Sequence, residues 1–130
     1  MSPKTNPKLQ RFDDGRLEVY RWHNHAPPGE YPERVLILRY TLPYQERTVG
    51  MQRYWTAHES KVRISHLLRC PLPPDTDGYL RPVSTEDVVM LRDGQQYTIR
   101  QIQYPEDIVP RVMDLTLEVA AQRHEVHSDD

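Results

Sequence analysis

The sequence has a single cysteine, Cys70, so neither an internal disulfide nor a zinc site built only from cysteines is possible. Glycine is scarce, with 5 residues among 130, and neither of the glycine-rich phosphate-binding patterns, GxGxxG or GxxxxGK(S/T), occurs. No apolar run approaches the roughly 20 residues of a membrane span, and the first residues lack the apolar stretch of a secretory signal. We therefore expect neither membrane insertion nor secretion.

Charge is nearly balanced overall but unevenly distributed. The formal net charge is -2, yet residues 1–65 carry a balance of +4 and residues 66–130 a balance of -6. Neither half has the strongly basic character of most nucleic-acid-binding domains. Halves of opposite sign suit copies of one chain that meet head to tail. The alternative is that acidic loops and a charged tail fall in the second half by chance.

Alternation of apolar and polar residues predicts strands in the first half. Residues 17–22 alternate and precede a proline-rich loop at 23–32. Residues 35–40 are apolar on both sides, which is typical of a central strand, and we expect this strand to end at Pro43. For the polar and aromatic residues 44–59, a strand and a short helix both remain open.

The second half gives the clearest local signal. Asp93-Gly94 separates two strand-like runs, 87–91 and 96–102, which predicts a hairpin because glycine accepts the positive φ of tight turns. Alternation over 61–69 predicts a strand with Arg69 on its wet face. Residues 113–119 predict another strand, preferred over a helix at 111–123, with Asp114, Thr116 and Glu118 facing solvent.

Together these patterns predict a mainly β protein, a small antiparallel β-barrel or sandwich of five to six strands with long loops. We expect one domain at 15–122, a flexible N-terminal arm at 1–14 and a disordered C-terminal tail at 123–130. The proline-rich stretch 71–86 is predicted to be a long loop. The predicted core residues are Val35, Ile37, Val62, Ile64, Val89, Leu91, Tyr97, Ile99, Leu115 and Leu117.

Residues that could carry chemistry do not form a recognisable set. The motifs His23-x-His25 and His124-x-x-His127 lack the companion ligands of a zinc site. The run His58-Glu59-Ser60 would alternate between faces of a strand and cannot form a triad. His66 is expected to be a hydrogen-bonded histidine, and Cys70 a buried structural thiol. The sequence therefore assigns no catalytic, cofactor-binding or metal-ligating residue.

Tyrosine and arginine are over-used. Eight tyrosines stand against one phenylalanine, and fourteen arginines against three lysines. Both residue types are enriched where proteins contact other proteins. Rings stacked near arginines also suit single-stranded nucleic acid. Composition favours a binding surface without identifying its partner.

One stretch resembles a known protein family. A strand Val62-Arg63-Ile64-Ser65-His66-Leu67-Leu68-Arg69 precedes a proline-containing loop, an apolar run, Asp93-Gly94 and then Tyr97-x-Ile99, and the alternating strand Met113 to Val119 follows. This order, over residues 34–120, resembles the head–tail joining (head-closure) proteins of tailed bacteriophages, in which a G-x-x-Y-x-I hairpin recurs. The segment before Val35 and the loop at 71–86 are longer here than in that family.

The resemblance implies a small β-barrel without catalytic activity or cofactor. Copies would form a ring on the portal or a head-completion adaptor, close the DNA-filled head and offer a surface to tail proteins. The ring need form only on the portal, so the free chain can be a monomer, and DNA in the channel is contacted without sequence specificity. The protein would be assembled in the host bacterial cytoplasm and end in the virion. Segments 43–59 and 71–86 are the expected interaction loops, with candidate contacts at Tyr44, Arg47, Tyr54, Trp55, Tyr79 and Arg81.

Two other functions remain open from the sequence. A small nucleic-acid-binding barrel is the alternative, and it predicts salt-dependent binding to single strands or duplex. An enzyme would require histidines or carboxylates gathered in a pocket.

Overall fold

The structure is a computed structural model and describes residues 8–47, 64–73 and 83–127. Within these ranges the chain is all β, and it contains no helix that could cross a membrane. The strands are β1 (Lys8–Leu9), β2 (Gly15–Asn24), β3 (Arg34–Arg47), β4 (His66–Pro71), β5 (Val88–Met90), β6 (Gln96–Gln103), β7 (Ile108–Val109), β8 (Val112–Val119) and β9 (Val126–His127).

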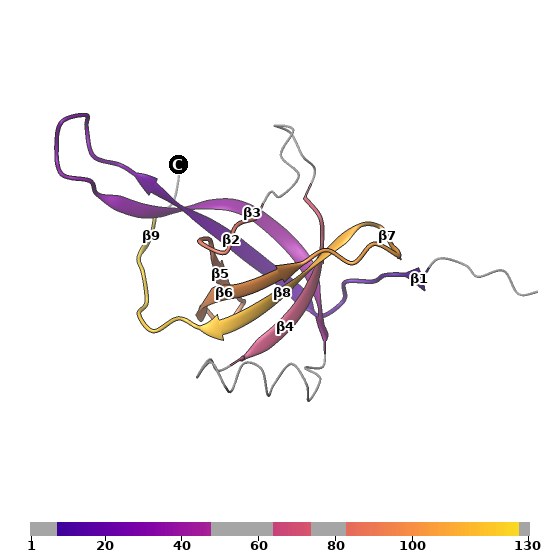
Figure 1. Ribbon diagram of the computed structural model, residues 1–130. Coiled ribbons are helices and arrows are strands. Elements are labelled where there is room, and N and C mark those ends of the chain that lie inside the picture. The colour runs from indigo at the N-terminus through magenta and orange to yellow at the C-terminus, as the bar shows by residue number, and fades with distance from the viewer. Residues whose placement is uncertain (1–7, 48–63, 74–82, 128–130) are drawn as a thin grey trace, which may run out of the picture.

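Six of these strands close into an antiparallel barrel (Figure 1). The order is β2-β5-β6-β8-β4-β3, and β2 also pairs with β3, which closes the barrel. The predicted fold, a small antiparallel β-barrel, is confirmed. Outside the barrel, β9 adds to β3 in parallel, and β1 forms a short parallel pair with β7. For residues 44–59, where a strand and a helix were both open, the structure shows a strand as far as Arg47, and 48–63 lie outside the described residues. Of the loop expected at 71–86, residues 74–82 also lie outside them.

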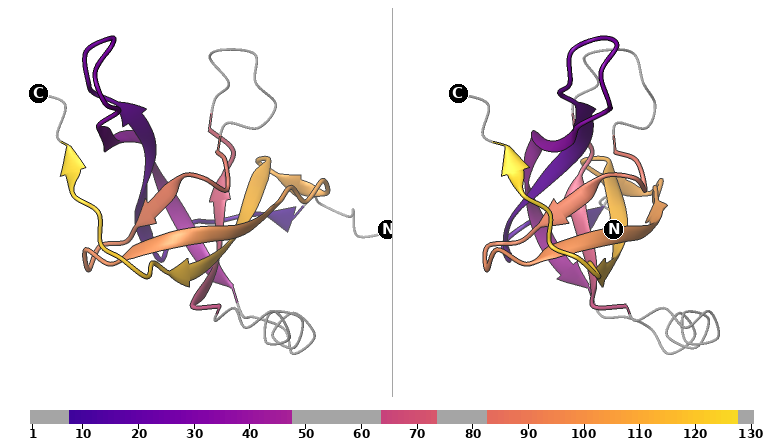
Figure 2. Two further views of the ribbon diagram at one scale, coloured as in Figure 1. Left: turned by 60° about the vertical axis from the view of Figure 1, so that its left-hand side comes forward. Right: turned by 90° about the vertical axis from the view of Figure 1, so that its left-hand side faces the viewer.

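β2 and β3 form a long two-stranded ribbon, the element that most shapes the molecule. A β-bulge lies in β3, because Val19 faces Tyr40 whereas Tyr20 faces Leu38, leaving Arg39 as the extra residue. β5 pairs with β2 only as far as Tyr20. Beyond that point the ribbon leaves the barrel, and its connecting loop at 25–33 stands clear of it (Figures 1 and 2).

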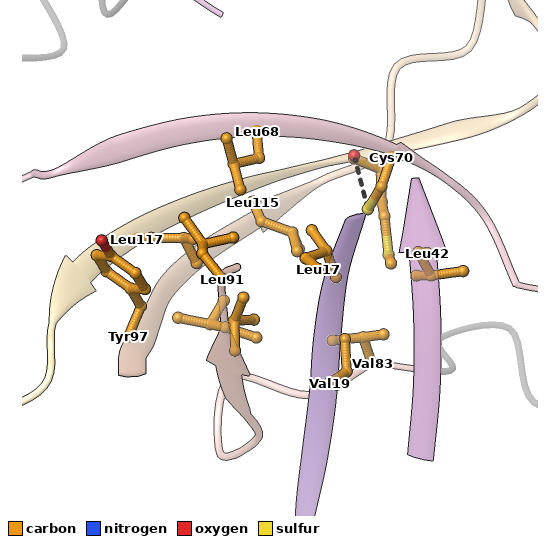
Figure 3. Packing of buried hydrophobic residues seen from close by; sticks show 13 residues of the cluster. Leu17, Val19, Leu42, Leu68, Cys70, Val83, Leu91, Tyr97, Leu115 and Leu117 are labelled. Atoms are coloured by element: carbon orange, nitrogen blue, oxygen red, sulfur yellow. Dashed lines mark hydrogen bonds between the residues drawn. The ribbon is translucent and has the colours of Figure 1, made fainter. Parts of the chain in front are cut away.

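Apolar side chains, most of them leucine and valine, fill the barrel and come from all six strands (Figure 3). Figure 3 also shows the Cys70 thiol, which donates to the carbonyl oxygen of Met113 at 3.9 Å. Burial raises the pKa of Cys70, and the nearby Asp114 carboxylate adds to this rise. The prediction of a buried structural thiol is confirmed. The fully buried residues of this cluster include Leu17, Val19, Leu68, Cys70, Val89, Met113, Leu115 and Leu117.

The predicted core is right in the second half of the chain and wrong in β3. Val89, Leu91, Tyr97, Ile99, Leu115 and Leu117 are buried as expected. Val35 and Ile37 are only half-buried, and Leu36 and Leu42 are buried in their place. The cause is that the ribbon has left the barrel at 35–37, so its inner side has no opposite wall. Ile64 is half-buried, and Val62 lies outside the described residues.

Two boundary predictions have different outcomes. The hairpin is confirmed, since Val89 pairs with Tyr97 and Gly94 adopts φ +81 in the turn. The expectation that β3 ends at Pro43 is wrong. Pro43 lies opposite Arg16 inside β3, and β4 pairs with β3 only from Gln45 onward. At Pro43, β3 therefore has one paired neighbour, and the missing N–H can face the unpaired side.

The prediction that Arg69 on β4 and Asp114 and Thr116 on β8 face solvent is also wrong. Arg69 and Asp114 are opposite each other and 8% and 7% exposed, and Thr116 is buried as well. Arg69 donates to Asp114 through Nε (2.7 Å) and Nη2 (2.9 Å), and its Nη1 donates to Gln10 Oε1 at 3.2 Å. The N-terminal segment therefore covers the outer face of these strands. Of the arm expected at 1–14, residues 8–14 are attached to the barrel, and 1–7 lie outside the described residues.

The C-terminal segment covers a second outer face. Gln96 accepts from the His124 N–H at 2.8 Å, and its side-chain amide donates to the His124 carbonyl at 2.6 Å. Beneath this segment, Tyr20, Leu36 and Val88 form a small apolar cluster against which Val126 packs. Residues 123–127 of the tail expected to be disordered are therefore held by a buried glutamine and an apolar contact.

Tyr20 gives this cluster a pH dependence. Burial, together with the hydrogen bond that the hydroxyl donates to Glu18 at 3.0 Å, raises the pKa of Tyr20 to about 12. The unfolded chain ionises near pH 10, so it releases this proton first, and the free energy of unfolding falls as pH rises from about 10 through 12. We expect Tyr20→Phe to flatten this fall in urea unfolding measured at about pH 9 and about pH 11.5. An equal fall in both proteins would contradict this role for Tyr20.

Candidate functional site

Only two of the six predicted contact residues lie in the described part of the chain. Arg47 is exposed at the end of β3. Tyr44 is half-buried and packs against the barrel core, with its ring 3.2 to 3.4 Å from where a Cβ on Gly15 would lie. Glycine suits this position because its φ is +147, which other residues rarely adopt, and because a Cβ would crowd the ring. Tyr54, Trp55, Tyr79 and Arg81 lie outside the described residues.

Tyr44 therefore has a packing role at this end of the barrel. Burial raises its pKa, and the carboxylates of Glu46 and Asp14 raise it further. The hydroxyl stays protonated over the ordinary pH range and remains a potential hydrogen-bond donor.

A chain of three polar side chains joins β3, β4 and β6. Glu46 Oε2 lies 2.5 Å from His66 Nδ1, and His66 Nε2 lies 3.2 Å from the Tyr97 hydroxyl. In the tautomer that donates from Nδ1 to the Glu46 oxygen, Nε2 accepts from the Tyr97 hydroxyl. His66 is a hydrogen-bonded histidine, as predicted.

This chain has carboxylate, imidazole and hydroxyl in series, but its end group is unsuited to attack a substrate. Tyr97 is 4% exposed, and burial raises its pKa, with Asp93 and Glu46 adding to the rise. A buried, protonated phenol that donates to His66 is a connection between strands. We assign these residues to holding the end of the barrel together.

The projecting ribbon and the C-terminal segment enclose a pocket of about 340 Å³. The Arg34 guanidinium lies 4.9 Å from the Trp22 ring centre, and the His124 ring meets Trp22 edge-on at 4.8 Å. His25 also lines the pocket. The two histidine motifs of the sequence thus each contribute one residue to the same place. Among the described residues, however, no group of three His, Cys, Asp or Glu side chains is placed to hold a metal ion.

The larger hollow, here called the outer groove, has a volume of about 500 Å³ and lies at the opposite end of the ribbon. Two guanidinium groups, one carboxylate and an apolar floor line it: Arg16, Arg92, Glu18, Met90 and Leu91, with Thr41 beside them. Three segments distant in the sequence supply these residues, so no linear motif announces them. The only signal available was the Asp93-Gly94 turn, which positions Arg92.

No protein-family model matches this chain, and no curated protein sequence matches it either.

Proposed function

We propose that this chain is a structural protein of a tailed-phage head–tail connector. Copies would form a ring between the portal, or an adaptor on it, and the tail, closing the DNA-filled head without an enzymatic step. The observation that carries the proposal is a closed barrel from which a two-stranded ribbon projects with an exposed aromatic residue in its loop. This is a rigid body with a protruding contact element, the form that a subunit of a ring requires.

The barrel is fastened in ways that suit a scaffold. The Arg21 guanidinium makes two 3.0 Å bonds to the Asp87 carboxylate, tying the ribbon to the segment before β5. The Arg69 and Asp114 pair fastens β4 to β8. Such bonds fix the angle at which the ribbon leaves the barrel and so reduce the entropy lost when copies dock.

The residues that carry the family resemblance also have structural roles that support the proposal. Gly94 takes the positive φ of the hairpin turn, and Tyr97 and Ile99 are buried in the barrel. The G-x-x-Y-x-I pattern thus specifies a hairpin and two core positions here. A head-closure protein would use the same pattern to build its barrel.

Electron microscopy of the purified portal of the phage that encodes this chain, mixed with the protein, tests the proposal. We expect added ring-shaped density at one end of the portal along the channel axis. Density absent at every mixing ratio contradicts it. A titration with single-stranded and duplex DNA at low salt runs beside it, since tight, salt-dependent binding without a portal complex would favour a nucleic-acid-binding barrel.

A further inference from the structure

The loop at the end of the ribbon, residues 25–33, is built to hold one shape. The Asn24 side-chain oxygen accepts from the backbone N–H groups of Ala26 (3.1 Å) and Glu33 (3.0 Å). The His25 N–H donates to the Glu33 carbonyl at 2.8 Å. Three of the nine loop residues are proline, which restricts the backbone further. A loop fixed in this way loses little entropy on binding.

This loop presents Tyr31 almost entirely to solvent. The side chain is 95% exposed, the highest exposure of a large apolar residue among the described residues. Tyrosine is a frequent anchor of protein interfaces because it combines a rigid apolar ring with a polar tip. Glu30 and Glu33 flank it and give the loop a negative charge.

The outer groove has the complementary properties. The half-buried Met90 provides apolar surface, the small exposed part of the core residue Leu91 (8%) lies beside it, and Arg16 and Arg92 are exposed at the rim. In the part of the chain that the structure describes, neither arginine takes part in an ion pair. The one acidic lining residue, Glu18, already accepts a hydrogen bond from Tyr20. The lining thus carries two guanidinium groups against one carboxylate, a positive excess that complements the negative loop, and its volume of about 500 Å³ is ample for a tyrosine side chain.

We propose that the loop at 25–33 of one copy docks in the outer groove of a second copy, with Tyr31 against Met90 and the loop carboxylates near Arg16 and Arg92. Loop and groove lie at opposite ends of the same ribbon, so the loop of a chain cannot reach the groove of that same chain. Each copy can dock on the next, and a head-to-tail contact of this kind forms a ring when its rotation closes. The inference rests on the proposed function and names the contact between neighbours in its ring.

Cross-linking through paired cysteines tests this contact. Pro28→Cys places a thiol in the loop and Thr41→Cys places one in the groove, both at exposed positions. The native Cys70 does not compete, because it is fully buried and burial raises its pKa. With a flexible bismaleimide we expect a ladder of covalent multimers, both in free solution at high concentration and on the portal. The matched control pairs Pro28→Cys with Gln101→Cys, an exposed position on β6 away from the groove.

A third substitution separates specific docking from random encounter. Tyr31→Ser in the Pro28→Cys, Thr41→Cys background should lower the ladder yield about tenfold, a change typical of losing an interface anchor. The melting temperature of this variant should equal that of its parent, because the Tyr31 side chain is 95% exposed and contributes little to the stability of the fold. A ladder of equal yield in the Gln101 control, no ladder in either setting, or a ladder insensitive to Tyr31→Ser overturns the loop-in-groove contact.

The two proposals fail separately. Ring density on the portal without the ladder overturns this contact and leaves the connector function standing. A ladder that depends on Tyr31, without any portal complex, supports the docking of copies and removes the connector function.

Discussion

Asp114→Ala is expected to lower the free energy of unfolding by about 3–5 kcal/mol. The carboxylate accepts two hydrogen bonds from Arg69, and both side chains are 9% exposed. Alanine would leave the Arg69 guanidinium buried without a carboxylate partner, with only the hydrogen bond to Gln10 remaining among the described residues. An unpaired buried charge is far more costly than the pair it came from. The loss is a large share of the roughly 5–15 kcal/mol that stabilises a typical domain.

Urea unfolding followed by tryptophan fluorescence measures this effect. Glu118→Ala is the matched control, because Glu118 lies on the same strand and its side chain, 27% exposed, faces Arg100 at 3.7 Å, whose side chain is 44% exposed. We expect the control to change stability by less than about 1 kcal/mol. The double variant Arg69→Met, Asp114→Leu removes both charges and should recover most of the loss. Equal, small effects of Asp114→Ala and Glu118→Ala would show that the pair is not buried as described.

Leu115→Ala should lower the free energy of unfolding by about 2–5 kcal/mol. Leu115 is 0% exposed in β8, a strand paired on both sides by β4 and β6. Its removal leaves a cavity that paired strands cannot collapse to fill. Val119→Ala on the same strand is the control, since Val119 is 47% exposed and its truncation should cost less than about 1 kcal/mol.

Leu115→Ala and Val119→Ala are compared by the urea concentrations at their unfolding midpoints, with one common value for the dependence of the free energy of unfolding on urea concentration. The closed barrel requires Leu115→Ala to have by far the larger shift. A tolerance of Leu115→Ala equal to that of Val119→Ala would contradict the enclosed core shown in Figure 3.

The hairpin and the strand at 113–119 could be predicted because their signals are local. Asp93-Gly94 specifies a turn by its own backbone preference, and four alternating apolar positions from Met113 to Val119 favour a strand over a helix. The inward side of β3 could not be predicted in the same way. Its residues 35–38 are all apolar, so no alternation indicates which side chains point inward. The bulge at Arg39 and the end of the β5 pairing decide which of them are buried.

The buried charges could not be found from the sequence for a different reason. Arg69 and Asp114 each alternate with apolar residues, as solvent-facing residues do. Their burial depends on strand pairing between β4 and β8 and on cover from the N-terminal segment. The same holds for the outer groove, whose lining comes from three segments. Tyr31 was accessible to sequence reasoning as a lone aromatic in a proline-rich loop, although it was not among the predicted contacts.

The function proposed for this chain follows from one physical arrangement: a stiff barrel, a projecting ribbon, and unlike surfaces at the two ends of that ribbon. Docking of unlike ends predicts that copies add to a partner ring cooperatively, because each added copy creates the groove for the next. It also predicts that Tyr31 matters for assembly and not for folding.

Native mass spectrometry of the portal saturated with this protein tests the central claim most directly. The account predicts two main species, bare portal and portal carrying one complete ring, with partly filled rings rare. A portal whose mass does not change at saturating protein, or one that gains scattered numbers of copies, contradicts it.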